Sequence, residues 1–550
     1  MYDYVIVGAG NAGCVLAARL TERPDLRVLL LEAGPPDDAA EVRVPAASHM
    51  LLKSAYDWGY TTIPQPAAHD RRVYWPRGRG LGGSSVTDAM TYLRGNRYDY
   101  DTWRDDLGCA GWGYADLLPY FRRAEDNERG RSPLHGTDGP MRVEEPRYRS
   151  PGSRAFVAAA RAYGLAGNDD FNGGRQIGAG YYQLTQRRGR RWTAADGYLA
   201  RARQRANLTV LTDATVTRVQ VDGARAAGVE YTHRGQALRA DAVREVIVCA
   251  GAVGTPRLLL LSGIGPGEHL RRHGIPVVRE LPGVGANLID PPTVTMRWHT
   301  PRVRALWERL GPGQLLRWLV TRGGPMASNV AEAGGFVHAG GARSVPDLQW
   351  RVIAAPYVGQ GLVDPGTREL SVLLALLAPA SRGSVRLRDA DPRTPPLIDP
   401  GYLTAPADLD RLIDAVRLTR DVAACEPLST ISAGETAPGE RIVGDRSLAA
   451  WVRGEVATSG RPYGTCAMGP ASHYTTVCDL SLRVHGIPGL RVVDASVIPG
   501  PLRALSGAPV IAMAERAADL IRGEAPLPPD EALTEATPPG HHLAQATLPR

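Results

Sequence analysis

A glycine-rich turn near the start of the chain has the residue types and spacing of a dinucleotide site. Gly8, Gly10 and Gly13 follow a short apolar run at residues 4–7 and precede a segment of helical character. In such a turn the first glycine permits the tight bend, the second lets backbone approach a pyrophosphate, and the third lets the helix lie close to the strand. The N–H groups and the positive dipole end of the helix would then favour a diphosphate.

An acidic residue completes this unit. Glu32 stands nineteen residues after Gly13, at the end of a second apolar run, where its carboxylate can accept hydrogen bonds from ribose hydroxyls. We expect Asn11, Ala12 and Ala33 to border the same site. The alternative is a strand–helix turn without a ligand, which is disfavoured because the strand, turn, helix and acid all occur in order.

A second glycine-rich segment, residues 78–85, reads Gly-Arg-Gly-Leu-Gly-Gly-Ser-Ser and runs into a segment of helical character. Backbone N–H groups and hydroxyls in such a turn suit a ligand that is anionic or rich in carbonyl groups. We therefore expect a second ligand contact from Gly82, Gly83 and Ser84.

Composition limits the classes of protein and partner. A chain of 550 residues predicts two to four domains, or one large interleaved pair. The net charge is +7, but no dense basic run is interleaved with aromatic residues, so no nucleic-acid partner is expected. The nearest basic cluster, residues 187–191, is interpreted as a solvated loop or, alternatively, as a group that steers an anionic substrate.

Cysteine spacing and hydropathy limit the kinds of site and the location that we expect for this protein. The six cysteines are scattered, so neither a metal site nor a disulfide framework is expected. The first strand begins at residue 2, and no apolar run approaches the roughly eighteen residues that a membrane span needs. We expect a cytoplasmic, soluble protein without a membrane partner, whose partner is a small-molecule substrate; the sequence predicts no particular oligomeric state.

Several kinds of element position these residues. Residues 4–7 and 27–31 are predicted to form buried parallel strands, because each is a short apolar run beside a turn. Residues 208–231 alternate in polarity and contain turns, which favours an antiparallel meander. Residues 101–128 are predicted to be helical, with a break at Pro119.

The sequence resembles the glucose-methanol-choline (GMC) family of flavin oxidoreductases over nearly the whole chain, and five blocks carry the resemblance. The blocks are residues 8–13 with Glu32, residues 78–95, residues 251–265, residues 282–288, and residues 464–469 through 494–496. Their order and spacing are highly specific to this family. The resemblance implies bound FAD, which supplies the redox chemistry while the protein orients it.

The resemblance also implies an α/β (mixed α+β) fold. A Rossmann-like FAD-binding domain would be interleaved in sequence with a substrate-binding domain built on an antiparallel sheet with helices. The FAD-binding domain is expected at residues 1–38, 76–145, 203–290 and 475–523, and the substrate-binding domain at residues 39–75, 146–202 and 291–474. Residues 524–550 are rich in Pro and Ala and are expected to form a disordered tail.

Roles for individual residues follow from the same resemblance. Gly8, Gly10 and Gly13 would hold the diphosphate and Glu32 the adenosine ribose. The other residues expected at the cofactor are Gly82, Gly83 and Ser84 along the flavin and diphosphate, Val216 on the adenine side, Asp494 and Ala495 at the ribityl chain, and Ala250, Gly251 and Pro509.

The catalytic positions depart from the family pattern. Arg461 stands where alcohol-oxidising members have a histidine that acts as base, and Gly507 stands where they have Asn or His. Asp88 replaces an asparagine, and Pro291 replaces a histidine. These replacements leave the family's usual proton transfer without its two side chains.

An arginine carries its proton at neutral pH, so Arg461 is not a general base. It can instead hold a carboxylate or phosphate, or stabilise an oxyanion or the reduced flavin; the alternative is a structural ion pair. Gly507 would leave room for a bulky substrate. Tyr463 and Ser459 are the nearest candidates for proton transfer, with His49 and Asp88 as further ones.

The expected function is oxidation of an alcohol or a related C–H group. Its substrate would be a small to medium-sized organic molecule, with secondary metabolites and anionic compounds among the candidates. One alternative is a GMC-type flavoprotein turned to cyclisation, elimination, lyase chemistry or decarboxylation. Another is a flavin-binding protein without catalytic activity.

Overall fold

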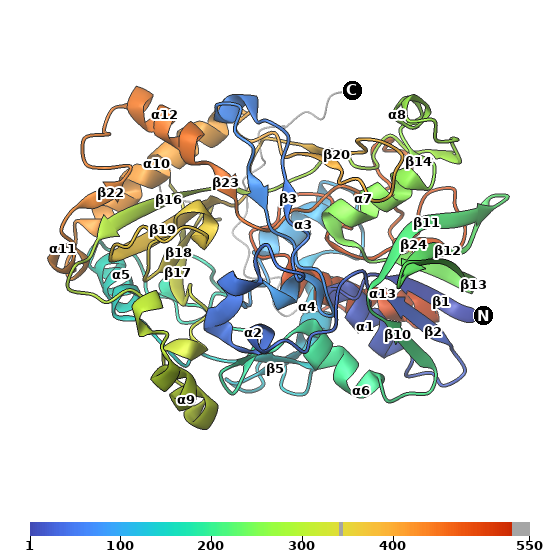
Figure 1. Ribbon diagram of the computed structural model, residues 1–550, viewed down its shortest axis with the longest axis horizontal. Helices are drawn as coiled ribbons and strands as arrows, with labels where there is room; N and C mark the ends of the chain where they lie inside the picture. Colours follow the sequence, from blue (N-terminus) through green and yellow to red (C-terminus); the bar gives the residue numbers. More distant parts are fainter. Residues whose placement is uncertain (340–344, 531–550) are drawn as a thin grey trace.

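Two seven-stranded sheets organise the computed structural model, which describes residues 1–339 and 345–530 (Figure 1). The sheet on the right of Figure 1 has the strand order β10-β2-β1-β13-β12-β11, with β24 paired to β13. The sheet on the left has the order β22-β16-β19-β18-β17-β7, with β23 paired to β16. The fold is therefore mixed α/β, as predicted.

The first sheet is parallel where it holds the glycine turn. Strand β1 (Tyr2–Val7) pairs in parallel with β2 (Val28–Leu31) and with the end of β13 (Gln236–Val248), and β24 (Leu490–Val492) pairs in parallel with β13. The paired parts of these strands are mostly apolar, and their charged residues Glu245 and Arg491 form an ion pair at 2.7 Å. Helix α1 (Asn11–Leu20) packs beside β1 and β2, and α13 (Gly507–Arg522) packs on α1.

One strand of the predicted meander lies elsewhere. Strands β11 (Ala214–Asp222), β12 (Arg225–His233) and the first half of β13 form an antiparallel meander. Strand β10 (Leu208–Leu211), predicted to belong to it, instead pairs in parallel with β2, Leu208 opposite Val28. The prediction was wrong there because a four-residue apolar run fits either kind of pairing.

The predicted helix at residues 101–128 is two helices, and its break is not at proline. Helix α3 (Arg97–Asp105) ends before a turn, and α4 (Tyr114–Ala124) contains Pro119 in its interior. A proline leaves the carbonyl four residues earlier without its helical donor. Here that carbonyl, on Ala115, accepts a hydrogen bond of 3.0 Å from the Asp530 N–H, which compensates for the lost bond.

The chain after α13 was expected to be disordered from residue 524. Its first part is instead held on α4: Leu527 N–H donates to Tyr120 Oη at 2.8 Å, and Arg122 pairs with Asp530 at 2.8 Å. Residues 531–550 lie outside the described residues.

The second sheet is antiparallel and carries helices on one face. It consists of β7 (Gly178–Tyr181), β17 (Ala333–Val337), β18 (Leu348–Ile353), β19 (Glu369–Leu376), β16 (Pro292–His299), β22 (Glu435–Ala437) and β23 (Ala457–Thr458). Helices α5 (Pro151–Ala162) and α10 (Pro406–Ala423) pack on it.

Alternation along β18 decides which side chains face away from those helices. Trp350 packs against Phe156 of α5 and donates to Thr419 of α10 at 2.9 Å. Because successive side chains of a strand point to opposite faces, Gln349 and Arg351 share the other face.

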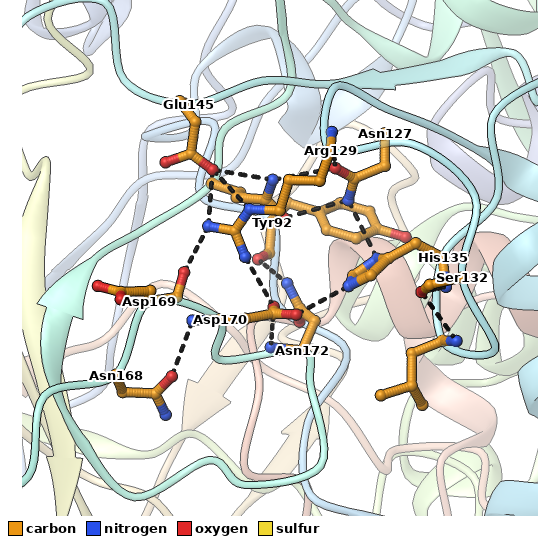
Figure 2. A network of polar contacts seen from close by, with 12 residues as sticks. Tyr92, Asn127, Arg129, Ser132, His135, Glu145, Asn168, Asp169, Asp170 and Asn172 are labelled. Atoms are coloured by element: carbon orange, nitrogen blue, oxygen red, sulfur yellow. Dashed lines mark hydrogen bonds and ion pairs between the residues drawn. The ribbon is translucent and has the colours of Figure 1, made fainter.

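A buried polar network joins the loop after α4 to residues 168–172 (Figure 2). His135 lies between two carboxylates, with Nδ1 3.2 Å from Glu125 and Nε2 2.9 Å from Asp170. Glu125 also pairs with the buried Arg94. This network ties together segments that are distant in sequence.

The remaining elements complete the two layers, and among residues 1–339 and 345–530 no helix is long and apolar enough to cross a lipid bilayer. The helices are α2 (Ala40–Arg43), α6 (Ala200–Ala202), α7 (Gly251–Leu261), α8 (Gly267–Arg272), α9 (Pro312–Thr321), α11 (Leu428–Ile431) and α12 (Asp445–Glu455). The strands are β3 (Tyr60–Thr61), β4 (Tyr74–Trp75), β5 (Glu125–Asn127), β6 (Met141–Val143), β8 (Gln186–Arg187), β9 (Arg190–Arg191), β14 (Ile264–Gly265), β15 (Arg279–Glu280), β20 (Ser384–Arg386) and β21 (Leu397–Asp399).

Candidate active site

A cavity of about 1300 Å³, counting its solvent-open mouth, gathers residues from the whole length of the chain. The predicted cofactor residues that line it are Gly8, Gly10, Asn11, Ala12, Glu32, Ala33, Gly83, Ser84, Val216, Ala250, Gly251, Asp494 and Ala495.

The N-terminal turn has the close packing that its glycines allow. Gly8 has a φ of +99°, and a Cβ there would lie 2.6 Å from the Cys249 carbonyl oxygen. A Cβ on Gly13 would overlap the Gly8 carbonyl oxygen, so a glycine is required for α1 to lie this close to β1. Gly13 does not line the cavity; its part in the site is this packing.

The second glycine block docks directly on the first. Gly82 N–H donates to the Ala9 carbonyl at 2.8 Å. Gly83 has a φ of +56°, and a Cβ there would lie 2.6 Å from Gly10 Cα. Two stretches of bare backbone therefore contact each other at the wall of the cavity, with Gly82 behind that wall.

Buried carboxylates hold the loops of the site in place. Glu32 accepts backbone N–H bonds from Ala9 and Gly34, both at 2.8 Å, and from Gly80 at 3.1 Å. Burial raises the pKa of Glu32 although these three donors oppose it. Most of its acceptor capacity thus organises protein backbone, which leaves less for a ribose than the sequence suggested.

Asp494 plays the corresponding part on the other side of the cavity. Its Oδ2 accepts from Gly251 N–H at 2.8 Å and from the Thr255 hydroxyl at 2.5 Å, and its Oδ1 accepts from Ser496 N–H at 2.7 Å. The α7 turn and the β24 end are joined through this one carboxylate.

The residues present fit a diphosphate-containing cofactor. Helix α1 begins at the cavity without a side-chain cap, so its first N–H groups are free to bind an anion. The Asn11 amide oxygen, at the same place, is buried without a hydrogen-bond partner in the part of the chain that the structure describes. A Cβ on Gly251 would meet no atom within 4 Å, which leaves open space beside that turn.

Comparison with known proteins decides the family. The N-terminal family model described as GMC oxidoreductase matches residues 2–293, and the C-terminal GMC oxidoreductase model matches residues 379–514. This chain belongs to the GMC oxidoreductase family. Its members and structural neighbours bind FAD, so the chain is an FAD-dependent oxidoreductase of the class that acts on CH–OH groups.

Relatives of known name share almost the full length of this GMC chain. Human mitochondrial choline dehydrogenase is 41% identical, over 95% of this chain and 90% of the relative. Oxygen-dependent choline dehydrogenase 1 of Chromohalobacter salexigens is also 41% identical, over 96% of each chain. The crystal structure of pyridoxine 4-oxidase from Mesorbium loti has a TM-score of 0.88 at 33% identity, covering 96% of this chain and all of the other.

Arg461 is fully enclosed and binds only neutral acceptors. Its side chain is 1% exposed, and it donates to Ser459 Oγ at 3.0 Å, the Ala504 carbonyl at 3.0 Å and Gln349 Oε1 at 2.8 Å. It makes no ion pair within residues 1–339 and 345–530, so the structural ion pair weighed from the sequence is not found there. Burial, together with the Arg351 guanidinium, lowers the pKa of Arg461 to about 9, so it remains a cation at neutral pH.

Tyr463 and Ser459, the predicted catalytic residues next to Arg461 in sequence, each hydrogen-bond to a different part of the protein. The Tyr463 hydroxyl is buried and accepts from Leu502 N–H at 3.0 Å, and burial raises its pKa. Ser459 Oγ is the acceptor for Arg461. Neither Arg461, Tyr463, Ser459 nor Gly507 lines the cavity, although their neighbours Pro462 and Ser506 do.

Gly507 and Pro509 lie in the first turn of α13, which begins at the cavity. A Cβ on Gly507 would lie 3.4 Å from Asn11 Nδ2, so this glycine packs beside α1. Pro509 is itself behind the wall, and Val510 lines the cavity in its place.

The remaining candidates for proton transfer are engaged elsewhere. The Asp88 carboxylate pairs with the buried Arg191 at 2.9 Å. The His49 ring lies 4.9 Å from Trp307 between centroids, and burial lowers the pKa of His49, so this imidazole is neutral at pH 7.

Several cavity residues were not predicted. Trp58 and Tyr60, stacked with ring centroids 5.8 Å apart, and Arg77 enter from the loop-rich stretch before the second glycine block. The gathering of aromatic residues in that loop-rich stretch, Tyr56, Trp58, Tyr60 and Tyr74, is the sequence signal that could have found them. The others are Val7, Leu31, Gly78, Ala214, Thr215, Cys249, Ala252, Val253, Gly254, Arg257, Leu258, Leu261, Pro392, Pro462, Ser506 and Val510.

Proposed function

We propose that the chain oxidises the CH–OH group of a small to medium-sized organic substrate that carries an acidic group, at an active site in which Arg461 replaces the usual histidine. The observation that carries the proposal is the buried guanidinium of Arg461, which binds three neutral acceptors and no carboxylate of the described chain. A buried cation of this kind is costly unless an anion compensates it. A bound acidic substrate would supply that anion.

The proposed charge separates this chain from its choline-oxidising relatives. Choline carries a quaternary ammonium group, and a like charge close to a buried guanidinium is strongly unfavourable. The relatives' names therefore support the type of reaction, and the charge of this site argues against their substrate.

FAD, when bound, would supply the two-electron redox chemistry. Gly8, Gly10 and Gly83 would keep side chains away from its diphosphate, and the N–H groups of the first turn of α1 would bind it. Arg461 holds the substrate anion or the developing oxyanion through its two unused N–H groups.

Gly507 leaves the second family position without a side chain, beside Asn11. No group at either position of the family pattern can accept the hydroxyl proton. We therefore propose that the hydroxyl proton leaves to water, since a substrate carboxylate bound to Arg461 is too weak a base to accept it.

Anaerobic mixing of the purified flavoprotein with alcohols of different charge tests the proposal. Hydroxy acids are expected to bleach the flavin absorbance, while choline is not. Product that forms while the flavin stays oxidised would favour the elimination or lyase alternatives. An Arg461→His variant is expected to lose activity on hydroxy acids and to gain it on uncharged alcohols.

A further inference from the structure

A second guanidinium lies beside Arg461, on the sheet that faces it. Arg351 and Gln349 share one face of β18, and Gln349 is the side chain that accepts from Arg461 at 2.8 Å. Arg351 reaches the same segment, with Nη2 3.4 Å from the Ser459 carbonyl oxygen. Its Nε is buried and has no hydrogen-bond partner in the part of the chain that the structure describes.

One carboxylate, that of Asp290, acts electrostatically on both Arg351 and Arg461. Its Oδ2 accepts from the Tyr402 hydroxyl, and its Oδ1 is buried without a hydrogen-bond partner among residues 1–339 and 345–530. Neither arginine is within ion-pair distance of a carboxylate in those residues, so no direct contact with a carboxylate of the described chain neutralises either guanidinium.

A third arginine is bound to the same segment but has more negative charge around it. Arg77 donates to the Gly460 carbonyl at 2.6 Å and lines the cofactor cavity. Asp290, Asp57 and Asp88 all act electrostatically on it. Arg77 makes no ion pair in the described residues either, but three carboxylates act on it, against one on each of Arg351 and Arg461.

We propose that Arg351 and Arg461 together bind the carboxylate of the substrate, so that the enzyme's substrates are hydroxy acids, and that Gln349 is a positioning residue for Arg461. This inference rests on the proposed function for the reaction at the CH–OH group. A carboxylate offers four acceptor sites in a plane, which suits two guanidinium forks with unused N–H groups. Gln349 supplies a neutral acceptor that fixes Arg461 without neutralising it.

Calorimetric titration of the FAD-loaded protein tests the inference without turnover. Benzoate and acetate are compared with benzamide and acetamide, which have similar shapes and no charge, and with inorganic phosphate. Wild-type protein is expected to bind the carboxylates at least tenfold more tightly than the matched amides. In Arg351→Met and Arg461→Met the carboxylate affinity is expected to fall by about 10- to 100-fold with the amide affinity unchanged.

Two further variants separate charge from folding. Arg351→Lys keeps the charge and is expected to retain most carboxylate affinity. Arg386→Met is the matched control, because Arg386 is a half-buried arginine that donates only to carbonyl groups, of Val284 and Val385, away from segment 459–461. Flavin content and unfolding temperature of each variant show whether it folds.

Equal binding of benzoate and benzamide by the wild type, or unchanged carboxylate affinity in Arg351→Met, would overturn the inference. So would phosphate that binds more tightly than either carboxylate. If the carboxylates bind as expected while no hydroxy acid reduces the flavin, the anion site stands and the proposed oxidation fails.

Discussion

Replacing Gln349 by glutamate turns the neutral partner of Arg461 into a competing anion. Gln349 Oε1 lies 2.8 Å from Arg461 Nη2, and the side chain is fully buried. The shape of the residue is kept, so the change is almost purely one of charge. If Arg461 exists to bind the substrate's carboxylate, an internal carboxylate at this point must weaken that binding.

The magnitude follows from two contributions. The existing bond already has one charged end, the Arg461 guanidinium, and a glutamate turns it into an ion pair, so the new carboxylate takes up part of the attraction that Arg461 offers a ligand. Repulsion between two carboxylates about 6 Å apart adds up to roughly 3 kcal/mol at an effective dielectric constant of about 20. After partial cancellation we expect a loss of about 2–3 kcal/mol, which is about 30- to 150-fold in Kd.

Titration of Gln349→Glu with benzoate, at a pH where the variant keeps its FAD, measures this loss. Gln349→Met has a similar volume and no charge, and it is expected to lose less than tenfold. The unfolding temperature of Gln349→Glu should not fall, because the new carboxylate pairs with a buried guanidinium. Wild-type affinity for benzoate in Gln349→Glu would refute the reasoning, since Arg461 would then have only a structural role.

The remaining predictions concern the cofactor cradle and the buried network. Gly83→Ala is expected to abolish FAD retention, because its Cβ would lie 2.6 Å from Gly10 Cα; Gly130→Ala, at a positive φ but with no atom within 4 Å, should keep the flavin absorbance of the wild type. Glu32→Gln has one acceptor oxygen for three backbone N–H groups and should lose about 1–3 kcal/mol in chemical denaturation together with flavin content; unchanged stability would mean that these bonds contribute little. Burial lowers the pKa of His135, but Asp170 and Glu125 outweigh it and raise that pKa above the ordinary value, so the ion pairs of His135 stabilise the fold below about pH 6.5 and are lost as the pH rises through the folded pKa. Denaturation midpoints of the wild type should fall over that range relative to those of His135→Gln, and parallel pH profiles would contradict this.

The cofactor half of the site could be predicted because its signals are local. The glycine turn, the adjoining strand and Glu32 lie within 35 residues of one another. Gly8 and Gly13 leave no room for a Cβ, whereas a Cβ on Gly10 would meet only Gly83 Cα, at 3.9 Å. Gly13 and Gly82 do not line the cavity; they pack behind its wall and support it. Sequence alone does not separate those two kinds of glycine, because both are required by close backbone approach.

Features set by distant parts of the chain were not predictable in this way. Pro119 is tolerated in α4 because Asp530, hundreds of residues later, supplies the missing donor. Strand β10 joins β2 rather than the meander because the parallel sheet has an open edge there. Arg351 carries no sequence signal at all: a single arginine in a strand becomes part of a site only when β18 meets the segment 459–461.

Rapid mixing of the oxidised flavoprotein with a hydroxy acid, and separately with the amide of that acid, in the absence of oxygen is the sharpest test of the proposed carboxylate site. We expect the acid to reduce the flavin at least tenfold faster at low concentration than the amide, and we expect this preference to disappear in Arg461→Met. Faster reduction by the amide or by choline, or a preference for the acid that survives in Arg461→Met, would contradict it.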